Sequence, residues 1–581
     1  MTKQSSKGVN VAALKKLLVL LREDYGRLAL AFVAVLVTTG LSLLAPYLFG
    51  RAIDRYVAVG DYRGIFLSAA VLCVAFVIIF GFQYAQMNLV GGVGLRVLFR
   101  LRNAIFTKLQ SLPIAFFHRQ KAGDLISRIN NDTDKLNSFF SETLVRFVGG
   151  VFMIIGSGVF ILVIQPKLAL ATLVPAIIIF MVTRTLSPWV KMQNSASMQT
   201  TGALSGEVQE SLDNFKVISA FHRQDYFVSR FTEVNTAHYA ASIRTGMANG
   251  VFMPMYELLS AMAQLIVIVY GVYLISQGQC TLGLLLSFLL YVERFYMPLR
   301  QLATLWNSFQ QALAGWERVS MILENTEELP ILSTQYSVLG TQNAVLEFKG
   351  VQFGYAEGKE ILRAADFVLQ AGKTYALVGP TGGGKTTTAS LMARLFDPTK
   401  GQVLLHGKDI RTYSAAERTQ AIGFILQEPF LFSGTILENI FIGNSEYAGK
   451  DEATLRRVLS DAGLDSLLAR FERGGESVLT SSITDLSLGQ KQLIAFMRAV
   501  LRRPDVLILD EATANIDTVT EQLLQETVEK LPKTTTKVII AHRLNTIQNA
   551  DEIFFVNGGE IQAAGSFEHA LDLLMHGKRQ S

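Results

Sequence analysis

Six apolar stretches of about 20 residues or more fill the first part of the chain, and they restrict its fold more than any other feature. They run approximately over 28–50, 64–90, 143–165, 167–189, 250–276 and 282–306. An α-helix needs about 20 apolar residues to cross a bilayer, because lipid offers its backbone no hydrogen-bonding partners. The sequence therefore predicts a transmembrane domain over residues 1–320, built from six helices.

The connections between these stretches alternate in length. Spans 3 and 4, and spans 5 and 6, are joined by very short loops, whereas the connections 91–142 and 190–249 are long. Within them, 95–112 and 206–232 keep apolar residues at helical spacing, which predicts helices there. The N-terminus and the first long connection are rich in lysine and arginine, including Lys15, Arg96 and Arg100. The positive-inside rule puts them in the cytosol. We therefore expect a multi-pass protein of a cell or bacterial inner membrane, with both long connections and the C-terminal half cytosolic.

The composition changes after the sixth stretch, from mainly apolar to mixed. Hydrophobic residues make up 50% of the 581 residues and charged residues 17%, unevenly distributed. Residues 321–340 read as a polar linker, and 341–581 as a soluble domain. Although the net charge is +5, no lysine- or arginine-rich tract with interleaved aromatic residues stands out, so no nucleic-acid partner is predicted. The two cysteines, Cys73 and Cys280, indicate no disulfide framework.

A glycine-rich motif in the soluble half matches G-x-x-x-x-G-K-[ST]. A predicted strand over 374–378 leads into it and a predicted helix over 386–396 follows. In such a loop, backbone N–H groups surround a nucleotide's phosphates, the lysine meets the β and γ oxygens, and the hydroxyl holds Mg²⁺. The residues predicted to bind ATP here are Gly379, Pro380, Thr381, Gly382, Gly383, Gly384, Lys385, Thr386 and Thr387, with Thr386 also a Mg²⁺ ligand.

Two further strands end in groups suited to ATP hydrolysis. The apolar run 506–509 ends in Asp510 and Glu511, and the run 537–541 is followed by His542. We expect Asp510 to hold Mg²⁺, Glu511 to polarise the attacking water and His542 to hydrogen-bond the γ-phosphate. A solvated acidic pair at a strand end is the alternative. The predicted fold is thus a membrane all-α six-helix transmembrane domain followed by an α/β P-loop nucleotide-binding domain.

With these motifs in this order, the chain resembles an ATP-binding cassette (ABC) exporter half-transporter of the multidrug or lipid type over nearly all of its length. The membrane half resembles that family at 51–54, Arg-Ala-Ile-Asp, and at 123–128, Gly-Asp-Leu-Ile-Ser-Arg. The resemblance implies that segments near 128–134 and 214–223 touch nucleotide domains, and that two such domains sandwich two ATP molecules. It assigns further roles: Tyr355 to adenine stacking, Gln427 to Mg²⁺ and the attacking water, and Ser487, Gly489 and Gln490 to a signature that contacts ATP held by the opposite subunit.

Some positions depart from the family pattern. Leu488 stands at the third place of the signature, where glycine is usual, and 478–485 and 514–517 also differ. A leucine side chain lies where backbone ordinarily approaches phosphate. With Glu511 and His542 intact, this combination resembles one member of the heterodimeric exporters. We therefore favour a second, different half-transporter as the partner, and a homodimer is the alternative.

Ionisable residues in predicted spans mark possible substrate paths, since charge is costly in a bilayer. The candidates are Glu257, Glu293, Arg294 and Arg300, although Glu293 and Arg294 could also pair with each other or face a subunit interface. The predicted function is ATP-driven export, by alternating access, of a hydrophobic or amphipathic compound such as a drug or lipid. Peptide export and an ATP-gated channel or regulator are the alternatives.

Overall fold

The chain divides into two compact units, each built from its own helices or sheets. The computed structural model describes residues 21–326, 329, 331–332, 341, 343–355, 358–447, 450–473, 476–477, 486–510, 518–540, 548–565 and 567–576. Unit 1 comprises residues 1–110 and 123–325, and unit 2 comprises 111–122 and 326–581. The chain therefore enters unit 2 twice, first for a short segment and then for its whole C-terminal part.

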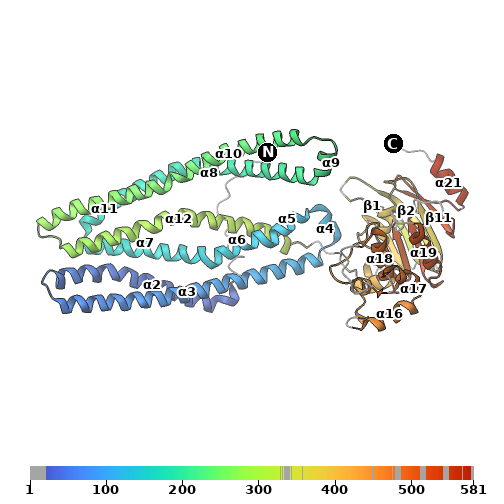
Figure 1. Cartoon of the computed structure of the whole chain (residues 1–581), viewed down its shortest axis with the longest axis horizontal. Coiled ribbons are helices and arrows are strands. Elements are labelled where there is room, and N and C mark those ends of the chain that lie inside the picture. Colours follow the sequence, from blue (N-terminus) through green and yellow to red (C-terminus); the bar gives the residue numbers. More distant parts are fainter. Residues whose placement is uncertain are drawn as a thin grey trace. The chain divides into compact units, whose positions relative to one another are not determined.

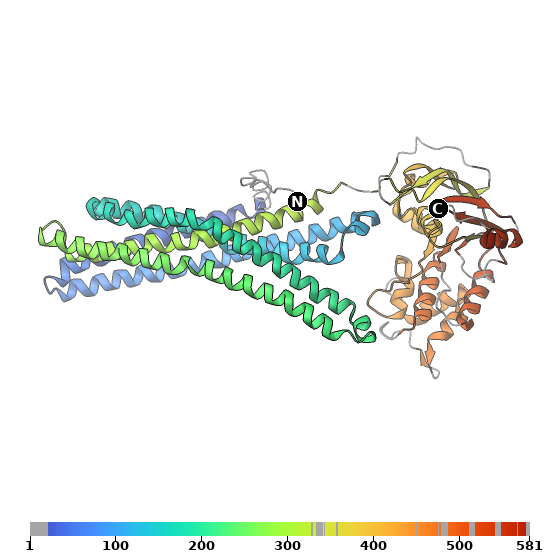
Figure 2. The ribbon, with the colours of Figure 1, turned by 90° about the horizontal axis from the view of Figure 1, so that it is seen from above.

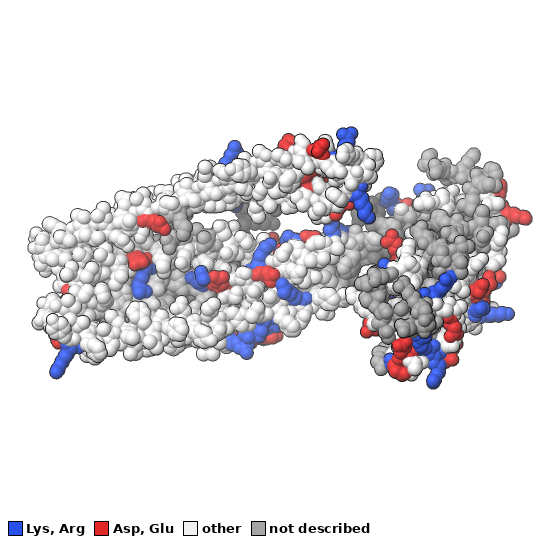
Figure 3. Space-filling view, in the orientation of Figure 1, with Lys and Arg blue, Asp and Glu red and all other residues white. Residues whose placement is uncertain are grey.

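Among the residues that the structure describes, unit 1 is helical, and six of its helical segments are long and apolar enough to cross a membrane. This confirms the six predicted spans. The main helices are α2 (Tyr25–Ala52), α3 (Tyr62–Ser111), α7 (Leu144–Ile164), α8 (Pro166–Asp213), α10 (Gln224–Gly250), α11 (Phe252–Ser276) and α12 (Leu282–Leu323). On the face shown in Figure 3, long stretches of this unit carry no charged side chain, as lipid contact requires.

The long connections extend the membrane helices, as the sequence predicted. Figures 1 and 2 show α8 and α10 running side by side to a short tip helix, α9 (Phe215–Ala220). The predicted helix through 206–232 is thus interrupted at Asn214 and at 221–223. In the first connection, α3 is followed by α4 (Ile114–Arg119), α5 (Ala122–Ser127), the π-helix η3 (Arg128–Asp132), α6 (Thr133–Ser138) and the π-helix η4 (Phe139–Thr143).

The first connection contributes to both units. Residues 128–134, expected to contact a nucleotide domain, belong to unit 1, whereas 111–122 with α4 belongs to unit 2. Within unit 2, Phe116 is buried and Ala115 packs against the main hydrophobic core. The apolar tip that precedes the motif therefore packs within unit 2, and contact of 128–134 with a nucleotide domain stays a prediction.

At the outer end of unit 1, α2 and α12 approach each other very closely at two glycines. A Cβ atom placed on Gly50 would lie 2.3 Å from the carbonyl oxygen of Gly283. Asp54, just beyond α2, accepts hydrogen bonds from the Thr281 hydroxyl at 2.5 Å and from the Gly283 amide at 2.7 Å. The carboxylate thereby satisfies donors at the N-terminus of α12, where helices favour negative charge.

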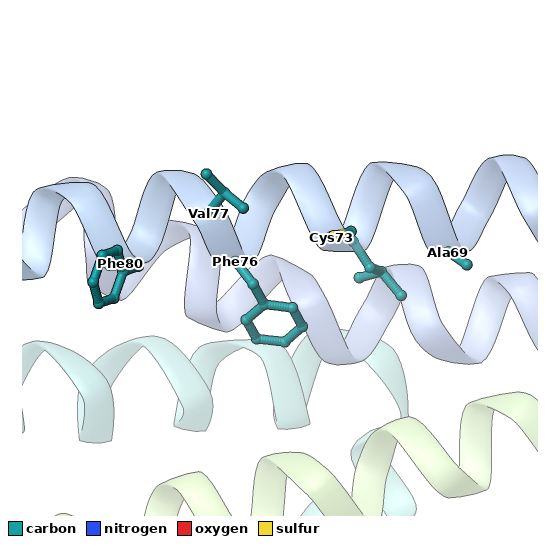
Figure 4. Close-up of a pocket in the computed structure, with 6 residues that line it drawn as sticks. Ala69, Cys73, Phe76, Val77 and Phe80 are labelled. Carbon is teal, nitrogen blue, oxygen red and sulfur yellow. The ribbon is translucent and has the colours of Figure 1, made fainter.

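A shallow apolar depression of about 590 Å³ lies on α3. Figure 4 shows side chains that line it, all from this one helix: Ala69, Leu72, Cys73, Phe76, Val77 and Phe80. The segment belongs to the second membrane span, so this surface is suited to contact with lipid acyl chains. Neither cysteine forms a disulfide.

Unit 2 contains the α/β fold that the sequence predicted. An antiparallel sheet has the order β2-β1-β4-β5, and a larger sheet has the order β12-β11-β3-β10-β9-β6, parallel except for β11 with β12. The strands are β1 (Ala344–Phe353), β2 (Leu362–Gln370), β3 (Thr374–Val378), β4 (Lys400–Leu405), β5 (Lys408–Asp409), β6 (Ile422–Ile425), β9 (Val506–Asp510), β10 (Thr536–Ile540), β11 (Glu552–Asn557) and β12 (Glu560–Ala563). A short hairpin, β7 (Glu472–Arg473) with β8 (Glu476–Ser477), stands apart from both sheets.

The helices of unit 2 cover these sheets and form two larger apolar clusters. They include α13 (Lys385–Met392), α14 (Ala415–Ala421), α15 (Ile436–Phe441), α16 (Glu452–Asp461), α17 (Asp465–Leu468), α18 (Leu488–Val500), α19 (Thr518–Glu529) and α21 (Phe567–His576). Parallel strands β3, β9 and β10 direct their C-terminal ends to one edge of the larger sheet. Ligands commonly bind at this edge of open α/β sheets.

Candidate nucleotide site

The glycine-rich loop between β3 and α13 has the backbone needed to surround an anion. Gly382 and Gly384 have φ of 83° and 116°, in the region that favours glycine. A Cβ on Gly379 would lie 2.0 Å from the carbonyl oxygen of Val556, on β11. The loop is thus held against the sheet edge at positions where only glycine fits, and the N-terminus of α13 follows it directly.

Lys385 folds back across this loop. Its Nζ donates to the carbonyl oxygens of Gly379 at 2.9 Å and Pro380 at 3.1 Å, and the residue is only 5% exposed. A buried ammonium group requires such partners. Phosphate oxygens can replace the two carbonyls with stronger, charge-assisted hydrogen bonds.

Thr386 and Asp510 meet at the sheet edge. The Thr386 hydroxyl lies 3.4 Å from Oδ1 of Asp510, which is the last residue of β9 and is nearly buried. A hydroxyl beside a carboxylate provides the hard oxygen donors that Mg²⁺ prefers. These two residues therefore fit the predicted metal site. Glu511 and His542 lie outside the described residues.

Tyr355 belongs to an aromatic cluster near the phosphate loop. Its hydroxyl lies 3.2 Å from that of Thr387, and its ring packs edge-on against Phe353 and Phe396 with centroids 5.0 and 5.2 Å apart. The side chain is half exposed. A ring supported at its edges, with exposed surface left over, is suited to stacking on a base.

His118, on α4, joins this cluster, and sequence analysis missed it. Its ring centroid lies 5.7 Å from that of Phe396 and 6.4 Å from that of Tyr355. Nothing in the local pattern around His118 signals nucleotide binding. The contact arises only because the segment 111–122 folds with unit 2.

Gln427 lies just beyond β6, the edge strand beside β9, and is exposed. Its backbone carbonyl accepts a hydrogen bond from the amide of Gln492, on α18, at 3.4 Å. The structure thus ties the segment that carries Gln427 to the helix that carries the predicted signature. The role of the Gln427 side chain stays a prediction.

The signature residues form the start of α18. Ser487 is the N-cap, where its hydroxyl accepts from the Gln490 amide at 3.2 Å and the Gln490 side chain accepts from the Ser487 amide at 3.0 Å. This capping box keeps the helix start intact. Leu488 is the first helical residue and is 42% exposed, whereas Gly489 is buried. Leucine is therefore tolerated by the fold, and its side chain changes only the surface presented at the helix N-terminus.

The membrane carboxylates differ in depth. Glu293 is exposed on α12, about 16 Å along the helix from Leu282 at 1.5 Å per residue. Its neighbour Arg294 is partly buried. Glu257 is exposed near the start of α11, much closer to the cytosolic side. Glu293 thus lies within the sixth span, Leu282–Leu299, where a charge in contact with lipid is costly.

Two family models match the chain. The model described as "ABC transporter transmembrane region" matches residues 28–299, and that described as "ABC transporter" matches 362–514. The first covers the six spans, and the second covers the phosphate loop, the signature and Asp510.

Full-length relatives match both units. An uncharacterized ABC transporter ATP-binding protein of Bacillus subtilis, YfiC, is 34% identical over 95% of this chain and 91% of its own length. A fatty acid ABC transporter ATP-binding/permease protein of Mycobacterium bovis is 34% identical over 84% of this chain and 76% of its own. The solved structure of a bacterial Atm1-family ABC exporter with ATP bound superposes with a TM-score of 0.77 at 25% identity, covering 96% of this chain and 97% of that one.

Proposed function

Because this chain belongs to the ABC transporter family, as an exporter half-transporter, we propose that it exports a hydrophobic or amphipathic compound by alternating access. It is a multi-pass membrane protein with a cytosolic nucleotide domain, and its ATPase activity is coupled to transport. The observation that carries the proposal is a single chain with six membrane spans and a phosphate loop whose Thr386 hydroxyl lies beside Asp510.

We assign the site residues as follows. The loop residues 379–387 bind the ATP phosphates, with Lys385 exchanging its two carbonyl partners for phosphate oxygens. Thr386, Gln427 and Asp510 hold Mg²⁺, which supplies charge stabilisation for phosphoryl transfer when bound. Glu511 takes a proton from the attacking water and His542 donates to the γ-phosphate. Tyr355 stacks on the adenine ring.

The transporter works as a dimer, because Ser487, Gly489 and Gln490 contact ATP held by the other subunit. ABC exporters act through two nucleotide domains. We favour a different half-transporter as the partner, on the grounds that Leu488 adds an exposed apolar side chain at the helix N-terminus that would approach phosphate. In that arrangement, the partner's signature completes the site that contains Glu511.

A hydrophobic or amphipathic substrate is favoured by two observations. One relative is a fatty acid transporter, and Glu293 places an exposed carboxylate, next to Arg294, within the sixth membrane span. A translocation path that accepts both an apolar body and a polar group would account for such a residue. A peptide substrate is the alternative within the same transport mechanism.

Transport into inverted membrane vesicles tests this function. Three fluorescent probes would be compared: an amphipathic dye, a labelled fatty acid and a hydrophobic peptide. We expect ATP-dependent accumulation of the dye or the fatty acid against its gradient, absent in Glu511→Gln. Accumulation of the peptide alone would show that the substrate is a peptide and not a drug or lipid. An ATP-gated downhill ion current without accumulation would indicate a channel instead.

A further inference from the structure

The chain passes between its two units at three points. It enters unit 2 at Ser111, returns to unit 1 at Gly123 and leaves again at Thr326. The second point lies at the start of α5, and the third follows the end of α12. The covalent connections between the two units therefore run through the ends of α3, α5 and α12.

An ion cluster in unit 1 fastens α5 to α12. Arg318, in the last turns of α12, contacts Asp132 of η3 through Nε at 3.1 Å and Asp124 of α5 through Nη2 at 2.5 Å. The Asp132 side chain is completely buried, whereas those of Asp124 and Arg318 remain about one-third exposed. One guanidinium thus bridges two carboxylates on the segment that returns from unit 2.

A second set of contacts surrounds this bridge. Arg128 pairs with Asp124 at 2.8 Å and donates from Nη1 to the backbone carbonyl of Arg318 at 3.3 Å. Lys135 pairs with Asp132 at 2.8 Å. Packing is equally close, because a Cβ on Gly315 of α12 would lie 3.1 Å from the Asp132 carbonyl oxygen. The two segments therefore meet through side chains, backbone and a glycine contact together.

The chemistry makes this fastening specific to arginine. A buried carboxylate that loses a partner is strongly destabilised, so Asp132 favours the joined state. The planar guanidinium of Arg318 donates a hydrogen bond to Asp124 and forms an ion pair with Asp132 in fixed geometry, whereas a lysine ammonium is a single point charge. The contacts resist separation of α5 from α12 more than they resist movement of both together.

We propose that Arg318 is a positioning residue that clamps α12 to the first cytosolic connection, so that both move as one body when the nucleotide domains close. The inference rests on the proposed function, because it assigns these residues to the transmission of ATP binding to the membrane helices. Without the clamp, α5 and α12 respond separately, and nucleotide binding no longer reorganises the outer ends of the spans.

The test uses the purified, full-length transporter assembly in lipid nanodiscs, with two readouts. Spin labels are attached to cysteines introduced by Val59→Cys and Gln277→Cys, at positions exposed in outer loops. The two native cysteines are removed by Cys73→Ala and Cys280→Ala. The distance between the labels is measured with and without Mg-ATP, and the ATP hydrolysis rate is measured in parallel. Neither readout requires the substrate to be known.

In Arg318→Ala we expect the hydrolysis rate to stay within about two-fold, because the residue lies outside the nucleotide unit. We expect the fraction of molecules that shift on ATP addition to fall roughly ten-fold. Arg318→Lys should fold fully, and the fraction of its molecules that shift on ATP addition should lie between those of Arg318→Ala and the unmodified protein. Arg146→Ala is the matched control, since it breaks only the exposed pair with Glu142 at 2.8 Å, which involves neither α5 nor α12, and should leave both readouts unchanged.

A covalent cross-link in place of the ion pair tests whether α5 and α12 stay joined throughout the transport cycle or must separate during it. Asp124→Cys with Arg318→Cys, joined by a bifunctional thiol reagent, should restore the ATP-driven shift lost before cross-linking. An unchanged shift in Arg318→Ala, or a cross-linked protein that stays locked, would overturn the clamp. If the unmodified protein neither hydrolyses ATP nor shifts, the proposed function itself fails.

Discussion

Tyr355 illustrates how single residues of unit 2 obtain their position from distant parts of the chain. Its ring is held by Phe353 and Phe396 from unit 2's main segment and is approached by His118 from the first connection. The glycine loop could be predicted from sequence because its chemistry is local: eight consecutive residues fix the backbone path. His118 could not, because its place depends on a long-range contact.

His118→Ala should weaken ATP binding. An aromatic contact contributes about 1 kcal/mol, so we expect the KM for ATP to rise by roughly five-fold with little change in kcat. ATP titration of the hydrolysis rate measures this. His118→Phe keeps a ring beside Phe396 and is expected to retain most of the affinity; an unchanged KM in His118→Ala would show that the contact does not support the base site.

The lengths of the membrane helices could be predicted from the sequence, whereas the contacts between these helices could not. Hydrocarbon thickness fixes how many apolar residues a span needs, so the six spans follow from composition alone. The close approach of α2 and α12 depends on Gly50 and Gly283, which lie in different spans. Nothing in either segment alone identifies the other as its neighbour. Small residues commonly permit such close contact between membrane helices.

Gly50→Ala should therefore destabilise unit 1. The added Cβ would lie 2.3 Å from the Gly283 carbonyl oxygen, so the helices must separate, at a cost of about 1–3 kcal/mol. We expect a lower midpoint of thermal unfolding in detergent. Gly40→Ala, on the same helix with no atom within 4 Å of its added Cβ, is the control and should not lower it. Equal effects of the two substitutions would contradict the close contact.

The altered signature has different consequences in a heterodimer and in a homodimer. The structure places Leu488 on an intact, capped helix start, so its effect falls on whichever ATP faces that surface. In a heterodimer this is the partner's ATP, and the site with Glu511 uses the partner's signature. In a homodimer, Leu488 faces the site that hydrolyses ATP.

Leu488→Gly distinguishes these assemblies. For the heterodimer we expect the hydrolysis rate of the purified complex to stay within about two-fold, because Leu488 does not face the site with Glu511. Leu488→Ala accompanies it, since glycine costs up to about 1 kcal/mol more than alanine within a helix. A several-fold increase in both variants would favour the homodimer and overturn our preference.

The most direct test of the account is the ATP hydrolysis rate of Glu511→Gln in the purified, membrane-reconstituted assembly, with bound ATP quantified in the same sample. Losing general-base assistance should lower the rate by about 10²-fold or more, while ATP remains bound. Lys385→Ala, which removes the phosphate-facing ammonium, should instead lose bound ATP. Hydrolysis by Glu511→Gln at the unmodified rate would contradict the claim that ATP cleavage at this site powers export.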